Sequence, residues 1–200
     1  MSSSQRKPAR RSTGARRSAE AEEAILQAAG EILQEAGYAG FSIEAVARRA
    51  KAGKPTIYRW WRGKADLLLD AYHRQKPEIP VPDTGNLEED LTVFVGTLLE
   101  HWRTTPSGNI FRSVLAEAQN DEAAAEAVRD YALDRRDHIA GIVKRARDRG
   151  EVASDTDPHA VAELVISFAW TQLITHRWPG EAELRAILRL IARGAKAERA

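Results

Sequence analysis

The sequence predicts an all-α protein, and three observations lead to that prediction. Apolar residues recur at helical spacing from Ala19 to near the end of the 200-residue chain. No segment shows the apolar–polar alternation between turns that marks a β-strand. Residues that favour helix ends lie between the stretches of helical periodicity. The sequence has no internal repeat of about 20–50 residues. These features favour separate helices packed around a common core.

The composition excludes several functional classes. Because the chain has no Cys, it has no disulfides, zinc–thiolate site, iron–sulfur cluster or thiol catalysis. No run of about 18 uncharged apolar residues is present, so we expect no membrane-spanning helix. The N-terminus lacks the apolar core of a secretory signal. We therefore expect a cytoplasmic protein with no metal and no cofactor.

Charge is distributed unevenly along the chain. The formal net charge is +1, yet residues 1–64 hold 13 Lys/Arg and 6 Asp/Glu, whereas residues 65–200 hold 17 and 23. A basic third followed by an acidic remainder indicates that the first part faces a polyanion. An ordinary solvated surface is the alternative explanation.

The first 40 residues predict an arm and a helix. Residues 1–18 hold six basic and no acidic residues, which predicts a disordered basic arm. The arm would act as an electrostatic tether or enter the minor groove of DNA; a transit peptide is the alternative. A helix is expected from Ala19, with an apolar stripe from Ile25 to Ala36 and its end at Gly37.

Ser42–Trp61 predicts two short helices joined by a tight turn. Ser42 can cap the first helix, and Pro55 suits the first turn of the second, which we expect to end near Trp61. The shape is that of a helix-turn-helix, whose second helix fits the major groove. Side chains able to meet DNA crowd the start of that helix: Lys54, Thr56, Tyr58 and Arg59.

The remaining elements follow a proline-rich boundary. A fourth helix begins near Lys64, and residues 76–85 predict an extended connector. Start signals for later helices lie at Asn86, Ser107, Asp121 and Asp157-Pro158, and a last helix covers about Glu181–Arg193. The predicted organisation is an arm (1–18), a helix-turn-helix domain (19–75), the connector (76–85) and a C-terminal domain (86–200).

The helix that begins at Pro158 is apolar nearly all round. Such a helix is buried on every side, and in a domain this small the second burial partner is plausibly another subunit. The alternative is the central helix of a monomeric core. The expected dimer interface draws on this helix and the last one: Val161, Leu164, Val165, Phe168, Leu184, Ile187, Leu188 and Ile191.

The segment SIEAVARRAKAGKPTIYRWWRGKADLLLDA, Ser42–Ala71, resembles the TetR family of transcriptional regulators. The family pattern joins a Ser- or Thr-capped helix, a short turn, a recognition helix with a Thr-Leu/Ile-Tyr core and a Lys at the start of the next helix. The family's turn usually carries Gly where this chain has Lys51, and often Ser where it has Gly53.

The resemblance implies how the protein would bind DNA. Ser42 and Lys64 would bind phosphates and Trp60 would donate its indole N–H to one, while Ile57 and Trp61 would lie in the core. The other implied contacts are with the groove, base edges or backbone: Lys54, Pro55, Thr56, Tyr58 and Arg59. Double-stranded DNA with a palindromic operator is the expected partner.

The resemblance also implies a homodimer, formed by a four-helix bundle from the last two helices, and a ligand pocket between the middle helices. A small molecule in that pocket would release a repressor from its operator. Candidates for the pocket are the aromatic and polar residues His101, Trp102, Phe111, Arg112, Tyr131, His138, Trp170 and Gln172.

Two other function classes are less well supported. A helical adaptor that binds protein would not need the basic N-terminal third. An enzyme would need a catalytic motif, and the sequence contains no HExxH, GxSxG or GxxxxGK[ST]. We therefore expect a DNA-binding regulator that is not an enzyme.

Overall fold

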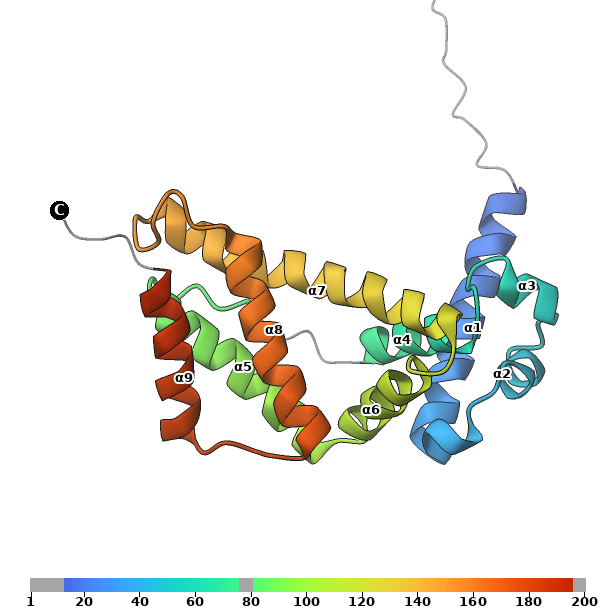
Figure 1. The fold of residues 1–200 in the computed structure, drawn as a ribbon. Helices are drawn as coiled ribbons and strands as arrows, with labels where there is room; N and C mark the ends of the chain where they lie inside the picture. Colours follow the sequence, from blue (N-terminus) through green and yellow to red (C-terminus); the bar gives the residue numbers. More distant parts are fainter. Residues whose placement is uncertain (1–12, 76–80, 196–200) are drawn as a thin grey trace, which may run out of the picture.

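The structure, a computed structural model, describes residues 13–75 and 81–195. In those ranges the regular elements are helices, so the all-α prediction is confirmed (Figure 1). Their bounds are α1 Thr13–Gly40, α2 Ile43–Arg49, α3 Lys54–Tyr58, α4 Lys64–Gln75, α5 Leu87–Thr104, α6 Ser107–Glu117, α7 Glu122–Asp148, α8 Pro158–Thr175 and α9 Glu181–Gly194. None of these helices is long and apolar enough to cross a membrane.

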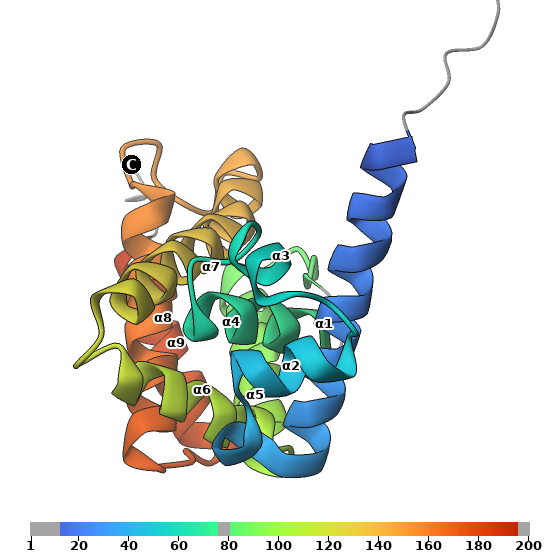
Figure 2. The ribbon, with the colours of Figure 1, turned by 90° about the vertical axis from the view of Figure 1, so that its right-hand side faces the viewer.

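The helices form two halves that share α4. Helices α2 and α3 lie at one end of the molecule, and α8 and α9 lie toward the other (Figure 1). Figure 2 looks onto the first end, with α2 and α3 facing the viewer. Helix α4 packs on α1 in the first half and on α6 and α7 in the second. A change in the position of α6 or α7 therefore acts directly on the half that contains α2 and α3.

Four helices begin with the side-chain caps that the sequence predicts. In each case a side-chain oxygen accepts a hydrogen bond from a backbone N–H in the first turn, which satisfies a donor that the helix leaves unpaired. The pairs are Ser42 with Ala45 (3.1 Å), Asn86 with Glu89 (3.0 Å), Asp121 with Ala124 (2.7 Å) and Asp157 with His159 (2.9 Å).

Two predicted helix ends are wrong. Ser107 is the first residue of α6 rather than its cap, because Pro106 holds the N-cap position with helical backbone angles. Helix α3 ends at Tyr58 instead of near Trp61. The chain turns away there because Trp61 enters the core, where it is 4% exposed and its indole Nε1 donates to Asp70 (3.0 Å).

The predicted arm needs correction in its second part. Residues 13–18, expected to be disordered, already belong to α1, and residues 1–12 lie outside the described residues. Ala and Arg favour helix, so the segment around Ala15–Arg17 extends the helix that follows it. Gly37 breaks the regular helix as expected, with φ +61° inside the stretch assigned to α1.

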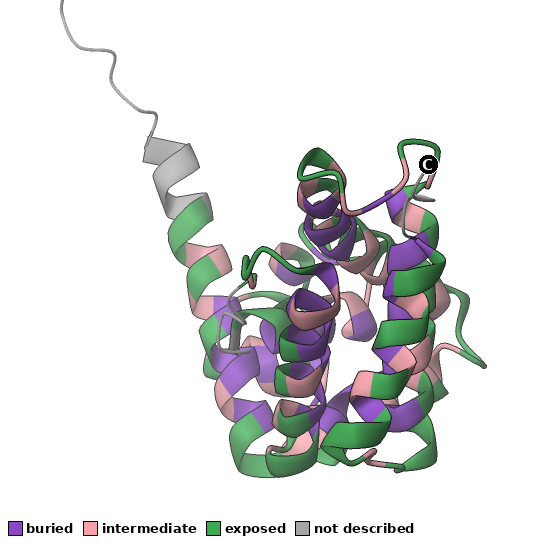
Figure 3. Ribbon diagram, turned by 90° about the vertical axis from the view of Figure 1, so that its left-hand side faces the viewer, coloured by how far each residue is buried: buried purple, intermediate pink, exposed green. Residues whose placement is uncertain are grey.

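Buried residues line the inner sides of the helices and form one continuous core across both halves (Figure 3). Within the single chain helix α8 is not buried on every side, and the expected burial of its remaining face by a second subunit stays a prediction. Leu164 is 58% exposed and Ile174 is 56% exposed, so one face of this apolar helix is open in the single chain.

Candidate functional site

Helix α3 presents polar and aromatic side chains outward. Ile57 is fully buried and anchors the helix to the core, as the resemblance implies. Tyr58 is 52% exposed and Trp60 is 41% exposed, and aromatic side chains with a polar tip are enriched at interfaces. The other predicted DNA contacts of this segment are exposed, except for Thr56, which is half-buried: Lys54, Pro55 and Arg59.

The turn before α3 contains an unusual backbone conformation. Lys51 has φ +51°, in the left-handed region that glycine adopts without strain. A residue with a Cβ pays about 1–2 kcal/mol there. The resemblance noted above implies Gly at this position, a residue that would adopt this conformation without strain.

Lys54 is ion-paired in the DNA-free protein. Its ammonium group donates to the carboxylate of Glu44, and this contact joins α3 to α2. The hydrogen bond from Lys54 lowers the pKa of Glu44, and the same bond raises the pKa of Lys54. Both side chains are exposed, so a DNA base or phosphate can replace Glu44 at little cost.

Two neighbouring candidates, Arg59 and Ser42, have side-chain contacts within the chain. The guanidinium of Arg59 lies 5.5 Å from the centroid of the Trp60 ring, an arrangement that orients both side chains. The oxygen of Ser42 accepts the capping bond from Ala45, and its hydroxyl hydrogen is still able to donate to a phosphate.

Lys64 lies against the C-terminal half rather than in open solvent. Its Nζ is 3.8 Å from the centroid of the Tyr38 ring and 3.9 Å from an oxygen of Glu117 at the end of α6. The hydroxyl of Tyr38 donates to the same carboxylate. Burial, together with this bond to Glu117, raises the pKa of Tyr38. Lys64, the predicted phosphate contact, therefore also interacts with Glu117 of α6 in the DNA-free protein.

Arg62 forms a second connection between the halves. It pairs with Asp66 on α4 (3.2 Å) and with Glu126 (3.1 Å) and Asp130 (2.8 Å) on α7. The hydrogen bonds to Asp66 and Asp130 raise the pKa of Arg62. Two cations just after the recognition helix are therefore held by carboxylates of the C-terminal half.

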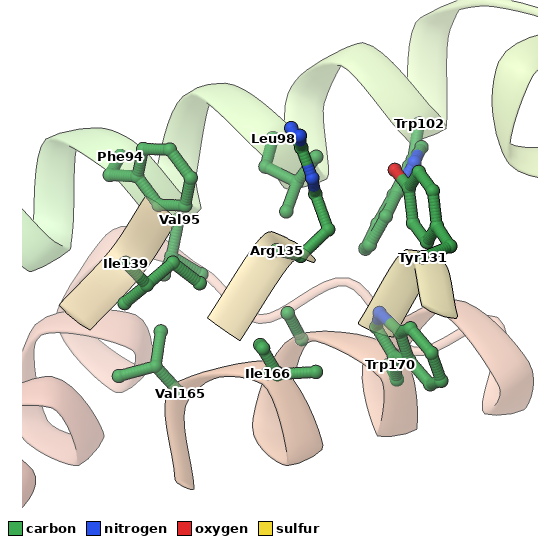
Figure 4. Close-up of a pocket in the computed structure, with 11 residues that line it drawn as sticks. Phe94, Val95, Leu98, Trp102, Tyr131, Arg135, Ile139, Val165, Ile166 and Trp170 are labelled. Carbon is green, nitrogen blue, oxygen red and sulfur yellow. The ribbon is translucent and has the colours of Figure 1, made fainter. Parts of the chain in front are cut away.

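A pocket lies between α5, α7 and α8 (Figure 4). Its space measures about 420 Å³ with the mouth included, but it is narrow, and the part wide enough for water holds only a few molecules. The lining is apolar and aromatic apart from one cation: Phe94, Val95, Leu98, Trp102, Tyr131, Arg135, Ile139, Val165, Ile166, Ala169 and Trp170.

The ligand candidates named from the sequence only partly meet in this pocket. Trp102, Tyr131 and Trp170 line it. Phe111 lies behind it, fully buried, with its ring 6.0 Å from Trp102 and 5.3 Å from Trp170 between centroids.

The other four candidates do not line the pocket. His138 contacts Phe94 (5.8 Å between ring centroids), and His101 is half-buried on α5. Arg112 donates to the backbone oxygen of Leu173 (3.4 Å), and Gln172 donates to that of Phe168 (3.4 Å).

Sequence reasoning missed Arg135, the only cation among the described lining residues. A signal for it existed, because Tyr131, Arg135 and Ile139 follow one another at a spacing of four and share one face of a helix. A cation on an otherwise apolar stripe is the pattern that would have identified it.

The eight residues expected at a dimer interface separate into two groups. Four are buried within the single chain: Val161, Val165, Leu184 and Leu188. Leu164 is exposed, while Phe168, Ile187 and Ile191 are half-buried. The expectation did not include Ile174 and Leu190, which are 56% and 71% exposed.

Comparisons with known proteins identify the family of this chain, with one match to its N-terminal half and one to its C-terminal half. A family model described as bacterial regulatory proteins of the tetR family matches residues 25–71. A second, described as a tetracyclin repressor-like C-terminal domain, matches residues 81–195, which is more than half of the chain. The chain belongs to the TetR family. It is therefore a DNA-binding transcriptional regulator with a helix-turn-helix, and members of this family are not enzymes.

Individual relatives are similar over most of their length. The chain is 31% identical over 144 residues to the uncharacterized HTH-type transcriptional regulator YdeS of Bacillus subtilis, covering 71% of this chain and 72% of that protein. It is 34% identical over 155 residues to the DNA-binding transcriptional repressor TetR of Mycobacteroides abscessus, covering 74% and 80%. The crystal structure of the TetR-family regulator SCO0332 aligns with a TM-score of 0.76 and 29% identity, covering 88% of this chain and 98% of that one.

The charge of this TetR-family regulator is less concentrated on its helix-turn-helix than the sequence totals indicate. Residues 19–64 hold seven Lys/Arg and six Asp/Glu, a balance of +1, so most of the basic excess belongs to residues 1–18.

In the described part of the chain, no group of three His, Asp or Glu side chains is placed to hold a metal ion.

Proposed function

We propose that the protein is a homodimeric repressor that occupies a palindromic operator and leaves it when a small molecule binds between α5, α7 and α8. The DNA contacts would be the eight residues Ser42, Lys54, Pro55, Thr56, Tyr58, Arg59, Trp60 and Lys64. Two copies related by two-fold symmetry would place one α3 in each half-site.

One contact supports the link between ligand and DNA more than any other. Trp102, a wall of the pocket, donates its indole N–H to the hydroxyl of Tyr72 on α4 at 2.7 Å. Tyr72 is buried, and burial raises its pKa, so it remains a neutral phenol. Because α4 also packs on α1, a ligand that moves Trp102 would move the half that carries α3.

The ion pairs of Arg62 and Lys64 would carry the same movement. Carboxylates of α6 and α7 hold both cations, so a shift of either helix changes where the cations point. For release, the ligand must prefer the conformation in which the two α3 helices no longer match the half-sites. A coupling of about 1–3 kcal/mol is typical of such switches.

The open apolar face of α8 and α9 supports the dimer. Leu164, Ile174 and Leu190 are each more than half exposed, on two helices that pack on each other, and exposed apolar surface is usual at protein interfaces. Ion pairs join α9 to α5 through Arg185 with Glu89 (2.6 Å) and Arg189 with Glu88 (2.9 Å), which helps to place α9 beside α8.

Selection of bound DNA from a random pool tests the operator. We expect a palindrome whose half-sites are about one helical turn apart or a multiple of it. Recovery of no sequence above nonspecific binding would contradict operator recognition and favour an adaptor.

Light scattering tests the dimer. The wild-type protein should have the mass of two chains, and Leu164→Glu should shift it toward one because two like charges would meet across the two-fold axis. Leu133→Glu is the matched control, since Leu133 is an exposed leucine on α7, outside the α8–α9 face. A monomeric wild-type protein at micromolar concentration would contradict the dimer.

A further inference from the structure

We propose that the pocket binds a flat, largely apolar molecule with one anionic group, such as an aromatic carboxylate, and that Arg135 binds the anion. The effect of such a ligand on DNA binding rests on the proposed function. The binding itself does not require DNA, so the two ideas can fail separately.

The shape of the pocket favours a planar ligand. Trp102, Tyr131 and Trp170 come from α5, α7 and α8, and their side chains lie together at one end of the lining (Figure 4). A flat ring system would displace these side chains least on entering the narrow space, whereas a bulky molecule would have to separate the helices.

The polar groups of the lining are donors. Arg135, Tyr131 and Trp170 carry N–H or O–H groups, and the lining includes no Asp, Glu, Asn or Gln within the described chain. Burial raises the pKa of Tyr131 to about 12, so its phenol keeps its proton at neutral pH. A cationic ligand would meet the like charge of Arg135 and no carboxylate among the described lining residues, whereas an anion would meet an opposite charge.

Arg135 has a donor left over for the ligand. Within the described residues its Nε is buried and has no hydrogen-bond acceptor. The guanidinium carbon lies 5.5 Å from the centroid of the Tyr131 ring, and the side chain extends from α7 toward α5 (Figure 4). A carboxylate can accept two parallel bonds from a guanidinium, which makes this group well suited to a planar anion.

Asp134 does not satisfy Arg135 fully. It accepts from the Nη2 of Arg135, and this bond lowers the pKa of Asp134. The Asp134 side chain is 67% exposed, whereas that of Arg135 is 19% exposed. Water therefore weakens the attraction of Asp134, and the enclosed part of the guanidinium remains positive toward the pocket.

Three matched probes test the sign of the ligand's charge on the full-length protein. They are 2-naphthoate, the neutral 2-naphthylmethanol and the cationic 2-naphthylmethylammonium, followed by calorimetry and by quenching of tryptophan fluorescence. We expect naphthoate to bind at least about tenfold more tightly than either of the other two, as charge-assisted hydrogen bonds allow.

Two arginine variants test the assigned residue. Arg135→Met should weaken naphthoate binding about tenfold or more and leave naphthylmethanol binding nearly unchanged. Arg129→Met is the matched control, because Arg129 is also on α7 but is 61% exposed and does not line the pocket. If the Met variant does not fold, Arg135→Lys replaces it; the loss of the planar fork should still weaken naphthoate several-fold.

Equal binding of the three probes, tighter binding of the cation, unchanged naphthoate binding by the Arg135 variants or no binding of any probe at millimolar concentration would each overturn the inference. Naphthoate that binds through Arg135 without changing operator affinity would support the inference and contradict ligand-controlled release. Failure of the wild-type protein to select an operator would contradict the proposed function alone.

Discussion

Lys54 and Arg135 are both cations paired with a carboxylate, yet the two ends of the molecule place them in opposite surroundings. Lys54 and Glu44 are exposed on α3 and α2, where water competes with the pair. Arg135 extends from α7 among aromatic and apolar side chains, and part of it is enclosed.

The difference bears on how each end can select a partner. At the exposed end the pair is exchangeable, so DNA has to supply many such contacts at once and selection comes from their number and geometry. At the enclosed end a single cation would determine which sign of charge a ligand can carry, as we propose for Arg135, because an unpaired charge there is costly. Five substitutions test the two ends, and they follow in order of decreasing expected effect, with Lys64→Ala beside Lys54→Ala because one measurement covers both.

Phe111→Ala should have the largest effect, because Phe111 joins the two ends. The ring is fully buried and lies 5.6 Å from Tyr72 and 5.2 Å from Tyr131 between centroids. Its removal leaves a cavity that the packed helices cannot fill, and we expect a loss of about 3–5 kcal/mol in the free energy of unfolding. Urea denaturation measures it. A loss under about 1 kcal/mol would show that the aromatic cluster is loosely packed.

Lys54→Ala should have the second largest effect, a weaker preference of the protein for its operator sequence. A lysine that pairs with guanine contributes discrimination of about tenfold or more, so the variant should lose preference at a symmetric pair of operator positions. Binding to operator and to scrambled DNA at several salt concentrations measures it.

Lys64→Ala is the matched variant in that measurement. It should weaken binding to both DNAs alike and lower the salt slope by about one per subunit, as expected for a lost phosphate contact. If Lys54→Ala weakened both DNAs equally and Lys64→Ala changed base preference, the assumed orientation of α3 on DNA would be wrong.

Glu44→Gln should have a smaller effect than Lys54→Ala and should raise operator affinity instead of lowering it. Without the carboxylate, Lys54 has no ion pair to break before it meets DNA, so operator affinity should rise by no more than about fivefold. Glu100→Gln, which removes the exposed partner of Arg103 on α5, is the control. A fall in affinity would mean that Glu44 orients Lys54 for DNA instead of competing with it.

Lys51→Gly should have the smallest effect. Glycine adopts the left-handed conformation of this turn without strain, but it also gains entropy in the unfolded chain. The two contributions leave a net stabilisation of up to about 1 kcal/mol, measurable as a rise in the melting temperature. Gly63→Ala is a useful comparison, since Gly63 follows α3 and has open space where a Cβ would lie. A lower melting temperature for Lys51→Gly would show that the lysine side chain contributes a stabilising contact.

The sequence predicts the first end of the molecule far better than the second, and the reason is the range of the interactions. The Ser42 cap spans three residues, and the burial of Ile57 and Trp61 follows from a motif within one segment. The pocket combines α5, α7 and α8, so its members could not be identified before those helices were placed.

The same limit explains two other features that the sequence did not predict. Lys64 is expected from the motif to face DNA, and nothing local indicates that Glu117 of α6 reaches it. The apolar residues of α8 and α9 are recognisable, but the sequence does not separate those that pack inside the chain, such as Val165, from those that face outward, such as Leu164.

The shortness of α3 has a consequence for how such a regulator can acquire a new target. The helix spans Lys54–Tyr58, and within it only Ile57 is buried in the core. The residues that would read DNA are therefore not the residues that hold the fold together. New operator preferences can arise through substitutions at Lys54 or Arg59 with little loss of stability, so one stable scaffold can serve many promoters.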